Sequence, residues 1–184
     1  MVSRADDVLR EIERRRGWRW FPIIGPEKGK ILADLIRRYK PKRVLEVGTL
    51  IGYSAILMGK ELESDAEIVS IEIDEDMAKI ARENIARAKI TARIEVLVGD
   101  ALKIIPRLDK EFDMVFLDAS KDEYLDYLKR VEDKLHKGTV IVADNAGASA
   151  RMMRNYLDYV RNSGRYESQF IRVGWDGIEV SIKL

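Results

Sequence analysis

The chain alternates between short, continuously apolar runs and longer runs in which apolar residues recur at helical spacing. The short runs are typical of strands that are buried on both faces of a sheet. They predict strands over residues 43–47, 67–72, 93–98, 112–117 and 138–143. The longer runs predict helices over residues 3–16, 27–39, 53–62, 75–88, 121–135 and 149–162. Residues 17–26 contain two glycines and two prolines and are expected to form a loop.

The order of these elements predicts an α/β fold. Alternating strands and helices build a parallel sheet with helices on both faces. The chain ends differently, with strand-like runs over 165–172 and 177–183 around Gly174 and the Asp176-Gly177 pair, which indicates a hairpin. We therefore expect a doubly wound, Rossmann-like and mostly parallel sheet of about seven strands with a terminal antiparallel hairpin strand. Residues 1–184 are expected to be one domain, in which residues 1–26 form an N-terminal helix and loop over the site.

The first predicted strand ends in a turn that contains Gly48 and Gly52 and leads into a helix. Glycine allows a sharp turn and a close approach of a ligand to backbone N–H groups. An acid, Glu46, stands where dinucleotide-binding motifs have their first glycine. A carboxylate repels a pyrophosphate but attracts an ammonium group. The spacing E-x-G-x-x-x-G resembles the first motif of class I methyltransferases that use S-adenosylmethionine (SAM). The alternative is a strand–turn–helix corner whose glycines serve packing only.

Acidic residues recur where the predicted strands end, at the edge of a parallel sheet where ligands bind. These residues are Glu46, Glu72, Asp100, Asp118 and Asp144. Glu72 follows Gly48 by 24 residues, near the spacing at which an acid binds ribose hydroxyls, unless it is a solvated strand-end acid. Asp100 is expected either to accept a hydrogen bond from an adenine amine or to cap the short helix that follows it.

The fourth and fifth predicted strands are followed by side chains suited to catalysis. Lys121 begins a helix three residues after Asp118, although a helix N-terminus disfavours a cation. Such a break of a local rule is expected at functional sites, and the alternative is a lysine that reaches solvent. Asp118, Asp144 and Asn145 together offer oxygen ligands suited to a magnesium-type cation.

Five motifs, in order along residues 22–184, resemble the metal-dependent O-methyltransferases, the family of catechol and caffeoyl-coenzyme A O-methyltransferases. The motifs are residues 22–29, 46–54, 99–106, 112–124 and 176–177. The chain departs from the family at Ser120, where many members have an aspartate, and at residues 146–148, where the family has a tryptophan. These departures touch the region that shapes the acceptor pocket, so the acceptor is not inherited from the resemblance.

The resemblance implies SAM as the methyl donor, a divalent cation such as Mg²⁺, and a small, hydroxylated, catechol-like acceptor. With the residues singled out above, it gives a candidate cofactor-binding set of Ile24, Glu46, Gly48, Gly52, Ser54, Glu72, Asp100, Ala101 and Asp118. The implied metal ligands are Asp118, Asp144 and Asn145. Lys121 is the implied catalytic lysine beside the substrate hydroxyl, together with Asp118. Relatives of this kind are often homodimers.

The composition of the chain mainly excludes certain kinds of site and of membrane segment. The chain has no cysteine and one histidine, which excludes disulfides, a thiol nucleophile and a cysteine- or histidine-rich metal site. No apolar run reaches the ~18–20 residues of a membrane span, and the N-terminus is charged from Arg4 onward. We therefore expect a cytoplasmic protein without a membrane partner. Charged residues make up 35% of the chain with a net charge of +1, a balance typical of thermophile proteins.

Two other functions compete with a small-molecule methyltransferase. The cluster of cations and aromatic residues over 14–20 suits RNA, so a tRNA methyltransferase acting on hydroxyuridine is an alternative. The competing interpretation of that cluster is a solvated helix end followed by aromatics packed over the cofactor. A non-catalytic SAM-binding regulatory module is the alternative of another class, but it would not need Lys121 or the implied metal ligands. A nicotinamide oxidoreductase is disfavoured because Glu46 opposes a pyrophosphate.

Overall fold

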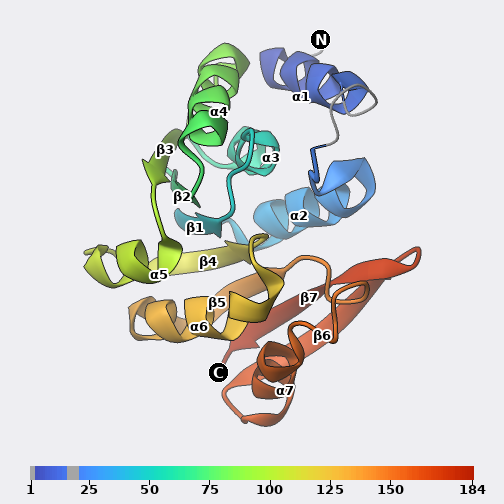
Figure 1. The fold of residues 1–184 in the computed structure, drawn as a ribbon. Coiled ribbons are helices and arrows are strands. Elements are labelled where there is room, and N and C mark those ends of the chain that lie inside the picture. The colour runs from blue at the N-terminus through green and yellow to red at the C-terminus, as the bar shows by residue number, and fades with distance from the viewer. Residues whose placement is uncertain (1–2, 16–20) are drawn as a thin grey trace.

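The computed structural model of the chain describes residues 3–15 and 21–184 (Figure 1). Its centre is a seven-stranded sheet with the order β3-β2-β1-β4-β5-β7-β6. The strands are β1 (Arg43–Val47), β2 (Glu67–Glu72), β3 (Arg93–Val98), β4 (Phe112–Leu117), β5 (Leu135–Ala143), β6 (Tyr166–Val173) and β7 (Asp176–Lys183). Neighbouring strands among β1 to β5 are parallel, whereas β7 is antiparallel to both β5 and β6. The predicted mostly parallel sheet with a terminal antiparallel hairpin is confirmed.

Helices cover both faces of this sheet, as predicted (Figure 1). One face carries α1 (Arg4–Arg15), α2 (Gly25–Tyr39), α3 (Tyr53–Glu61) and α4 (Glu75–Ala88). The other face carries α5 (Ala101–Ile104), α6 (Tyr124–Val131) and α7 (Arg154–Asn162). Successive strand side chains point to opposite faces, so Met114 and Phe116 of β4 join the first core and Val115 and Leu117 join the second. This burial on both faces explains why residues 114–117 of β4 are an unbroken apolar run in the sequence.

Several boundaries outside β1 to β4 differ from the prediction by one to three residues, and two helices differ by more. The helix expected over 121–135 is reduced to α6, with 3₁₀ turns at Lys121–Glu123 and Glu132–Lys134, and β5 begins already at Leu135. The helix expected over 149–162 begins only at Arg154 as α7, and residues 144–153 form turns. There, the backbone N–H groups of Gly147 and Ala148 donate to Asp176 Oδ1 at 3.2 and 2.8 Å. This long-range contact, which periodicity does not reveal, fixes the start of the segment as a loop.

The N-terminal helix α1 packs on α3 and α4, at the top of Figure 1. Lys60 Nζ lies 2.7 Å from Asp6 Oδ1, and Tyr53 Oη donates to Glu13 Oε1 at 2.5 Å. Pro22, which precedes α2, borders the cavity described below. None of the helices within residues 3–15 and 21–184 has the length and apolarity that a bilayer crossing requires.

Candidate functional site

A cavity of about 500 Å³ opens at the carboxyl ends of the parallel strands. Most of the predicted site residues line it: Ile24, Gly48, Ser54, Glu72, Asp100, Ala101, Asp118, Lys121 and Asn145. Glu46, Gly52 and Asp144 do not border the cavity. The wall also contains residues that were not predicted, among them Tyr53, Ile73, Glu123 and Tyr127. The rule that ligands bind beyond the ends of parallel strands therefore found the right edge of the sheet.

Glu46 is fully buried behind the cavity wall. Its carboxylate accepts hydrogen bonds from the hydroxyls of Ser54 and Ser70, and Ser54 itself borders the cavity. Burial raises the pKa of Glu46 to about 7, although the two serine hydrogen bonds oppose this shift. The structure thus separates Glu46 from the cavity by one hydroxyl group, and the carboxyl group lacks a cationic side-chain partner among the described residues.

The raised pKa of Glu46 predicts a pH-dependent stability. Because the native pKa lies above the ordinary value of 4.5, the native state holds one proton more than the unfolded state between about pH 4.5 and pH 7. Glu46 should therefore lower the free energy of unfolding by roughly 2–3 kcal/mol as the pH rises through this range. Urea unfolding at several pH values measures this slope. Glu46→Gln should flatten it, whereas Glu111→Gln at an exposed loop position should not; an unchanged slope in Glu46→Gln would contradict the assignment.

The acid that ends β2 and the acid that follows β3 both accept backbone hydrogen bonds from nearby loops or helix starts, and both border the cavity. Glu72 accepts hydrogen bonds from Leu50 N at 2.7 Å and from Asp74 N at 3.0 Å, so it fixes the turn after β1. Asp100 accepts from Leu102 N at 2.9 Å and caps α5, which is one of its two predicted roles. Its position on the cavity wall leaves the adenine contact as a prediction.

The two glycines of the first motif serve different purposes. Gly48 has a φ of +99° and borders the cavity, and a Cβ there would lie 2.2 Å from the carbonyl oxygen of Asp118. Gly52 is the N-cap residue of α3, and a Cβ there would lie 3.2 Å from the backbone of Ala81 in α4. Gly48 therefore lets two loops meet at the cavity, whereas the structure gives Gly52 the packing role that the sequence left as the alternative.

Lys121 points back toward the end of β4. Its Nζ lies 2.8 Å from Asp118 Oδ1 and 2.9 Å from Tyr124 Oη, and its side chain is only 17% exposed. The short 3₁₀ turn over Lys121–Glu123 places Lys121 beside Tyr124, three positions later in the chain. The alternative of a lysine extended into solvent therefore does not describe this structure. Tyr124, which sequence reasoning missed, also donates to the backbone oxygen of Asp144 at 3.3 Å.

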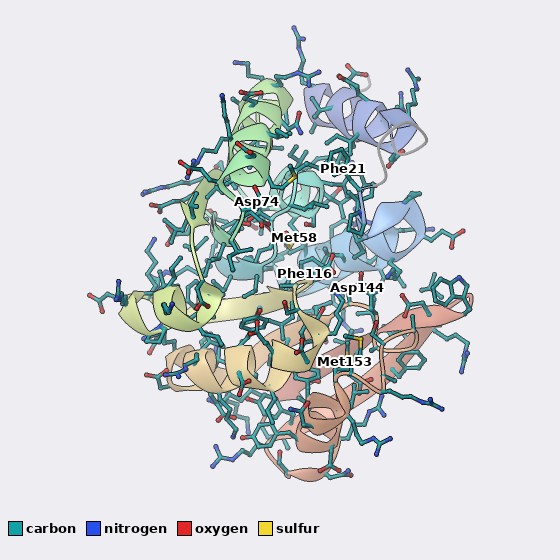
Figure 2. All side chains as sticks on the ribbon, in the orientation of Figure 1. Phe21, Met58, Asp74, Phe116, Asp144 and Met153 are labelled. Atoms are coloured by element: carbon teal, nitrogen blue, oxygen red, sulfur yellow. The ribbon has the colours of Figure 1, made fainter. Side chains whose placement is uncertain are left out.

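The end of β5 forms a network with α2 and β7. Asn145 adopts a φ of +61°, and its Nδ2 donates to Asp176 Oδ2 at 2.8 Å. Lys28 Nζ of α2 donates to the same oxygen at 2.9 Å and lies 2.6 Å from Asp144 Oδ1. Asp144 is buried, and it lies toward the middle of the molecule in the view of Figure 2. The network joins three elements that are far apart in the sequence.

Charge and burial set the ionisation of the three residues in this network. Burial raises the pKa of Asp144 to about 6, and the nearby charge of Asp118 acts in the same direction while Lys28 opposes it. Burial also works against ionisation of Asp176, but hydrogen bonds from Ala148 N and Lys28 outweigh it and lower the pKa to about 2. The pKa of Lys28 is raised, because Asp144 and Asp176 outweigh the effect of its own burial. Lys28 is therefore a charged ammonium group.

The implied metal ligands differ in how available their oxygen atoms are to a hard cation. Asp144 Oδ1 has no hydrogen bond of good geometry, and its close contact is the Lys28 ammonium. Because Asp176 binds the amide nitrogen of Asn145, the amide oxygen remains as an acceptor. The described residues contain no group of three or more His, Cys, Asp or Glu side chains that could hold a metal ion. The residues fit a cation only if the amide oxygen takes part and other ligands come from water or an acceptor.

Comparison with known proteins supplies the class of chemistry. A sequence model of the O-methyltransferase family matches residues 6–161. The chain belongs to the O-methyltransferase family. Catechol O-methyltransferase B of Danio rerio is 37% identical over 197 residues, which cover all of this chain and 72% of the relative. Catechol O-methyltransferase of Mus musculus is 37% identical over 155 residues, 80% of this chain and 58% of the relative. This O-methyltransferase therefore spans little more than half of that mouse relative.

A solved structure agrees with this assignment. The structure of the O-methyltransferase TomG from Streptomyces achromogenes, in complex with SAM, matches this chain with a TM-score of 0.88 and 27% sequence identity. The match covers 97% of this chain and 90% of TomG. The predicted family, fold class and enzyme class are thus confirmed. The alternatives of a regulatory module and a nicotinamide oxidoreductase lose their support. Most of the basic and aromatic cluster behind the tRNA alternative, residues 16–20, lies outside the described residues.

One residue of the site network, Lys28, could have been found by a rule already applied to the sequence. Lys28 lies in the first turn of α2, where a cation is as unfavourable as Lys121 is at its own helix start. Asp176 belongs to the hairpin motif that was matched to the family, but its contact with Asn145 spans 31 residues and has no local signal.

Proposed function

We propose that this O-methyltransferase transfers the methyl group of SAM to a hydroxyl oxygen of a small, catechol-like acceptor with the assistance of a divalent cation, Mg²⁺ in the simplest case. One observation carries the proposal. Lys121, paired with Asp118 at the end of β4, lies on the wall of the same cavity as Asn145 after β5. A proton-handling group and oxygen ligands for a cation thus share one end of a cavity whose other end carries Glu72 and Asp100.

The donor end of the cavity suits a cationic molecule without phosphate groups. Glu72 and Asp100 border it, Asp118 lines the same cavity, and Glu46 lies directly behind Ser54. These carboxyl groups attract the sulfonium and ammonium charges of SAM and disfavour a pyrophosphate. Ile24 and Pro22 of the N-terminal segment form part of the same wall, which supports a covering role for residues before α2.

The acceptor end supplies binding and orientation. A bound divalent cation would act as a Lewis acid toward two adjacent acceptor oxygens, with Asp118, Asp144 and Asn145 holding it. Lys121 Nζ is held by Asp118 and by Tyr124 Oη, so its position is fixed before the acceptor arrives. From there the ammonium of Lys121 would stabilise the negative charge that develops on the acceptor oxygen, or, once it has released its own proton to solvent, the neutral amine would accept the hydroxyl proton. The enclosing wall restricts water and aligns the two reactants, which is the main requirement of methyl transfer.

A methyl-transfer assay tests this function. The purified protein is incubated with SAM and a catechol, a coenzyme A ester of a hydroxylated acid, or tRNA, with Mg²⁺ and after exhaustive chelation. We expect methylation of the catechol, with a loss of at least about 100-fold on chelation that added Mg²⁺ restores, because the cation stabilises the acceptor oxyanion. Turnover that survives complete removal of metal would exclude the cation. Methylation of tRNA alone would replace the acceptor in this proposal.

A further inference from the structure

The ammonium group of Lys28 occupies a position between two carboxylates that no step above uses. It lies 2.6 Å from Asp144 Oδ1 and 2.9 Å from Asp176 Oδ2, and its side chain is only 13% exposed. Asp144 is 3% exposed and has no other cationic side chain in contact within the described residues. Two buried carboxylates at this distance from one ammonium repel each other strongly when the ammonium is removed.

Lys28 also acts on the amide group of Asn145 through a shared partner. Asp176 Oδ2 accepts from Lys28 Nζ and from Asn145 Nδ2 at once. This oxygen therefore holds the amide with its nitrogen toward β7 and its oxygen free. A cation at the acceptor end would consequently meet Asp144 already paired and Asn145 already oriented.

The charges near this end can be counted. The carboxylates are those of Asp118, Asp144 and Asp176, and the ammonium groups are those of Lys28 and Lys121. With both lysines present the group carries one net negative charge, and without Lys28 it carries two. A divalent cation would neutralise the group without Lys28, but it would leave the group with Lys28 at a net charge of +1. Lys28 thus weakens the attraction of the site for a second cation.

Resting on the proposed cation-assisted function, we propose that Lys28 is a positioning residue that serves as the internal counter-ion of Asp144 and Asp176 and competes with the divalent cation for Asp144. It keeps the acceptor end assembled while no metal is bound, and it sets the metal affinity below that of the bare carboxylates. A purely structural ion pair between α2 and the hairpin would not have this second effect.

Metal binding to matched variants tests the competition. Mn²⁺ serves as the probe, and its affinity is measured by isothermal titration calorimetry and by the electron paramagnetic resonance of free Mn²⁺. Lys28→Met should bind Mn²⁺ about tenfold more tightly than the wild type, since the competing ammonium is gone. Lys28→Arg, which keeps the charge, should bind like the wild type. Lys30→Met removes a charge from an exposed position of the same helix and should also bind like the wild type.

The same variants give a second readout. Without metal, Lys28→Met should unfold at a lower temperature than the wild type, and Mn²⁺ should raise its midpoint more than that of the wild type. If Lys28→Met does not fold alone, added Mn²⁺ should restore its folded circular dichroism spectrum, and failure to do so counts against the proposal. Equal or weaker Mn²⁺ binding in Lys28→Met, equal gains in Lys30→Met, or no binding by any variant would overturn it. A wild type without methyl transfer but with the tighter Lys28→Met site would instead contradict the proposed reaction only.

Discussion

Replacing Lys121 by methionine is expected to lower kcat for methyl transfer by about 10²–10⁴-fold, the usual contribution of a positioned acid or base. The ammonium is held 2.8 Å from Asp118 Oδ1 and 2.9 Å from Tyr124 Oη, at the wall of the cavity. Methionine preserves the length of the side chain and its packing against Tyr124 but can neither move a proton nor stabilise an oxyanion. Steady-state kinetics with a catechol measures kcat, and calorimetry with SAM measures donor affinity, which should remain within a few-fold of the wild type.

A matched variant separates this effect from a general loss of charge. Lys129 lies on α6, the helix that follows the 3₁₀ turn of Lys121, 3.6 Å from the centre of the Tyr159 ring and outside the cavity wall. Lys129→Met should keep wild-type kcat. If Lys121→Met turned over as fast as Lys129→Met, Lys121 would have no catalytic role, and the pairing with Asp118 would be a structural contact only.

Replacing Gly48 by alanine is expected to destabilise the protein by about 2–4 kcal/mol, because a strained backbone conformation and a steric clash add together. Gly48 has a φ of +99°, and its Cβ would lie 2.2 Å from the carbonyl oxygen of Asp118. That oxygen belongs to backbone, so the end of β4 itself must move. Denaturant unfolding measures the stability, and SAM titration should show weaker binding in the fraction that folds.

A second glycine provides the control for backbone strain. Gly138 has a φ of +90°, and a Cβ there meets nothing within 4 Å. Gly138→Ala should therefore cost only the conformational part, about 1 kcal/mol. The difference between the two variants isolates the clash with Asp118. Equal losses in both would mean that the two loops are not pressed together at Gly48.

Much of this fold could be predicted because its signals are local. The strands β1 to β4 have the bounds predicted from the sequence, since each is a short run rich in β-branched and other apolar residues, and β4 is buried on both faces. The acids at the strand ends were found in the same way, because one topological rule brings these ends together. Glu72 and Asp118 therefore border the cavity as expected.

The remaining features depend on contacts between distant segments. The pairing of Lys28 with Asp144 spans more than a hundred residues, and although Lys28 is unusual at a helix start, no local signal identifies Asp144 as its partner. The position of Glu46 behind Ser54 depends on which face of β1 turns toward α3, which the motif alone does not state. Similarly, the loop at Gly147 and Ala148 is held by hydrogen bonds to Asp176, which the local sequence does not reveal.

The position of the hairpin affects the order in which parts of the protein can fold during synthesis. β7 lies between β5 and β6 in the sheet, although it is made after both. Asp176 at its first position supplies the acceptor for Asn145 and for the loop after β5. The ends of β1 to β4 can therefore come together in a nascent chain while β7 is still inside the ribosome, but the end of the cavity that carries Asn145 stays incomplete until that strand has emerged and inserted.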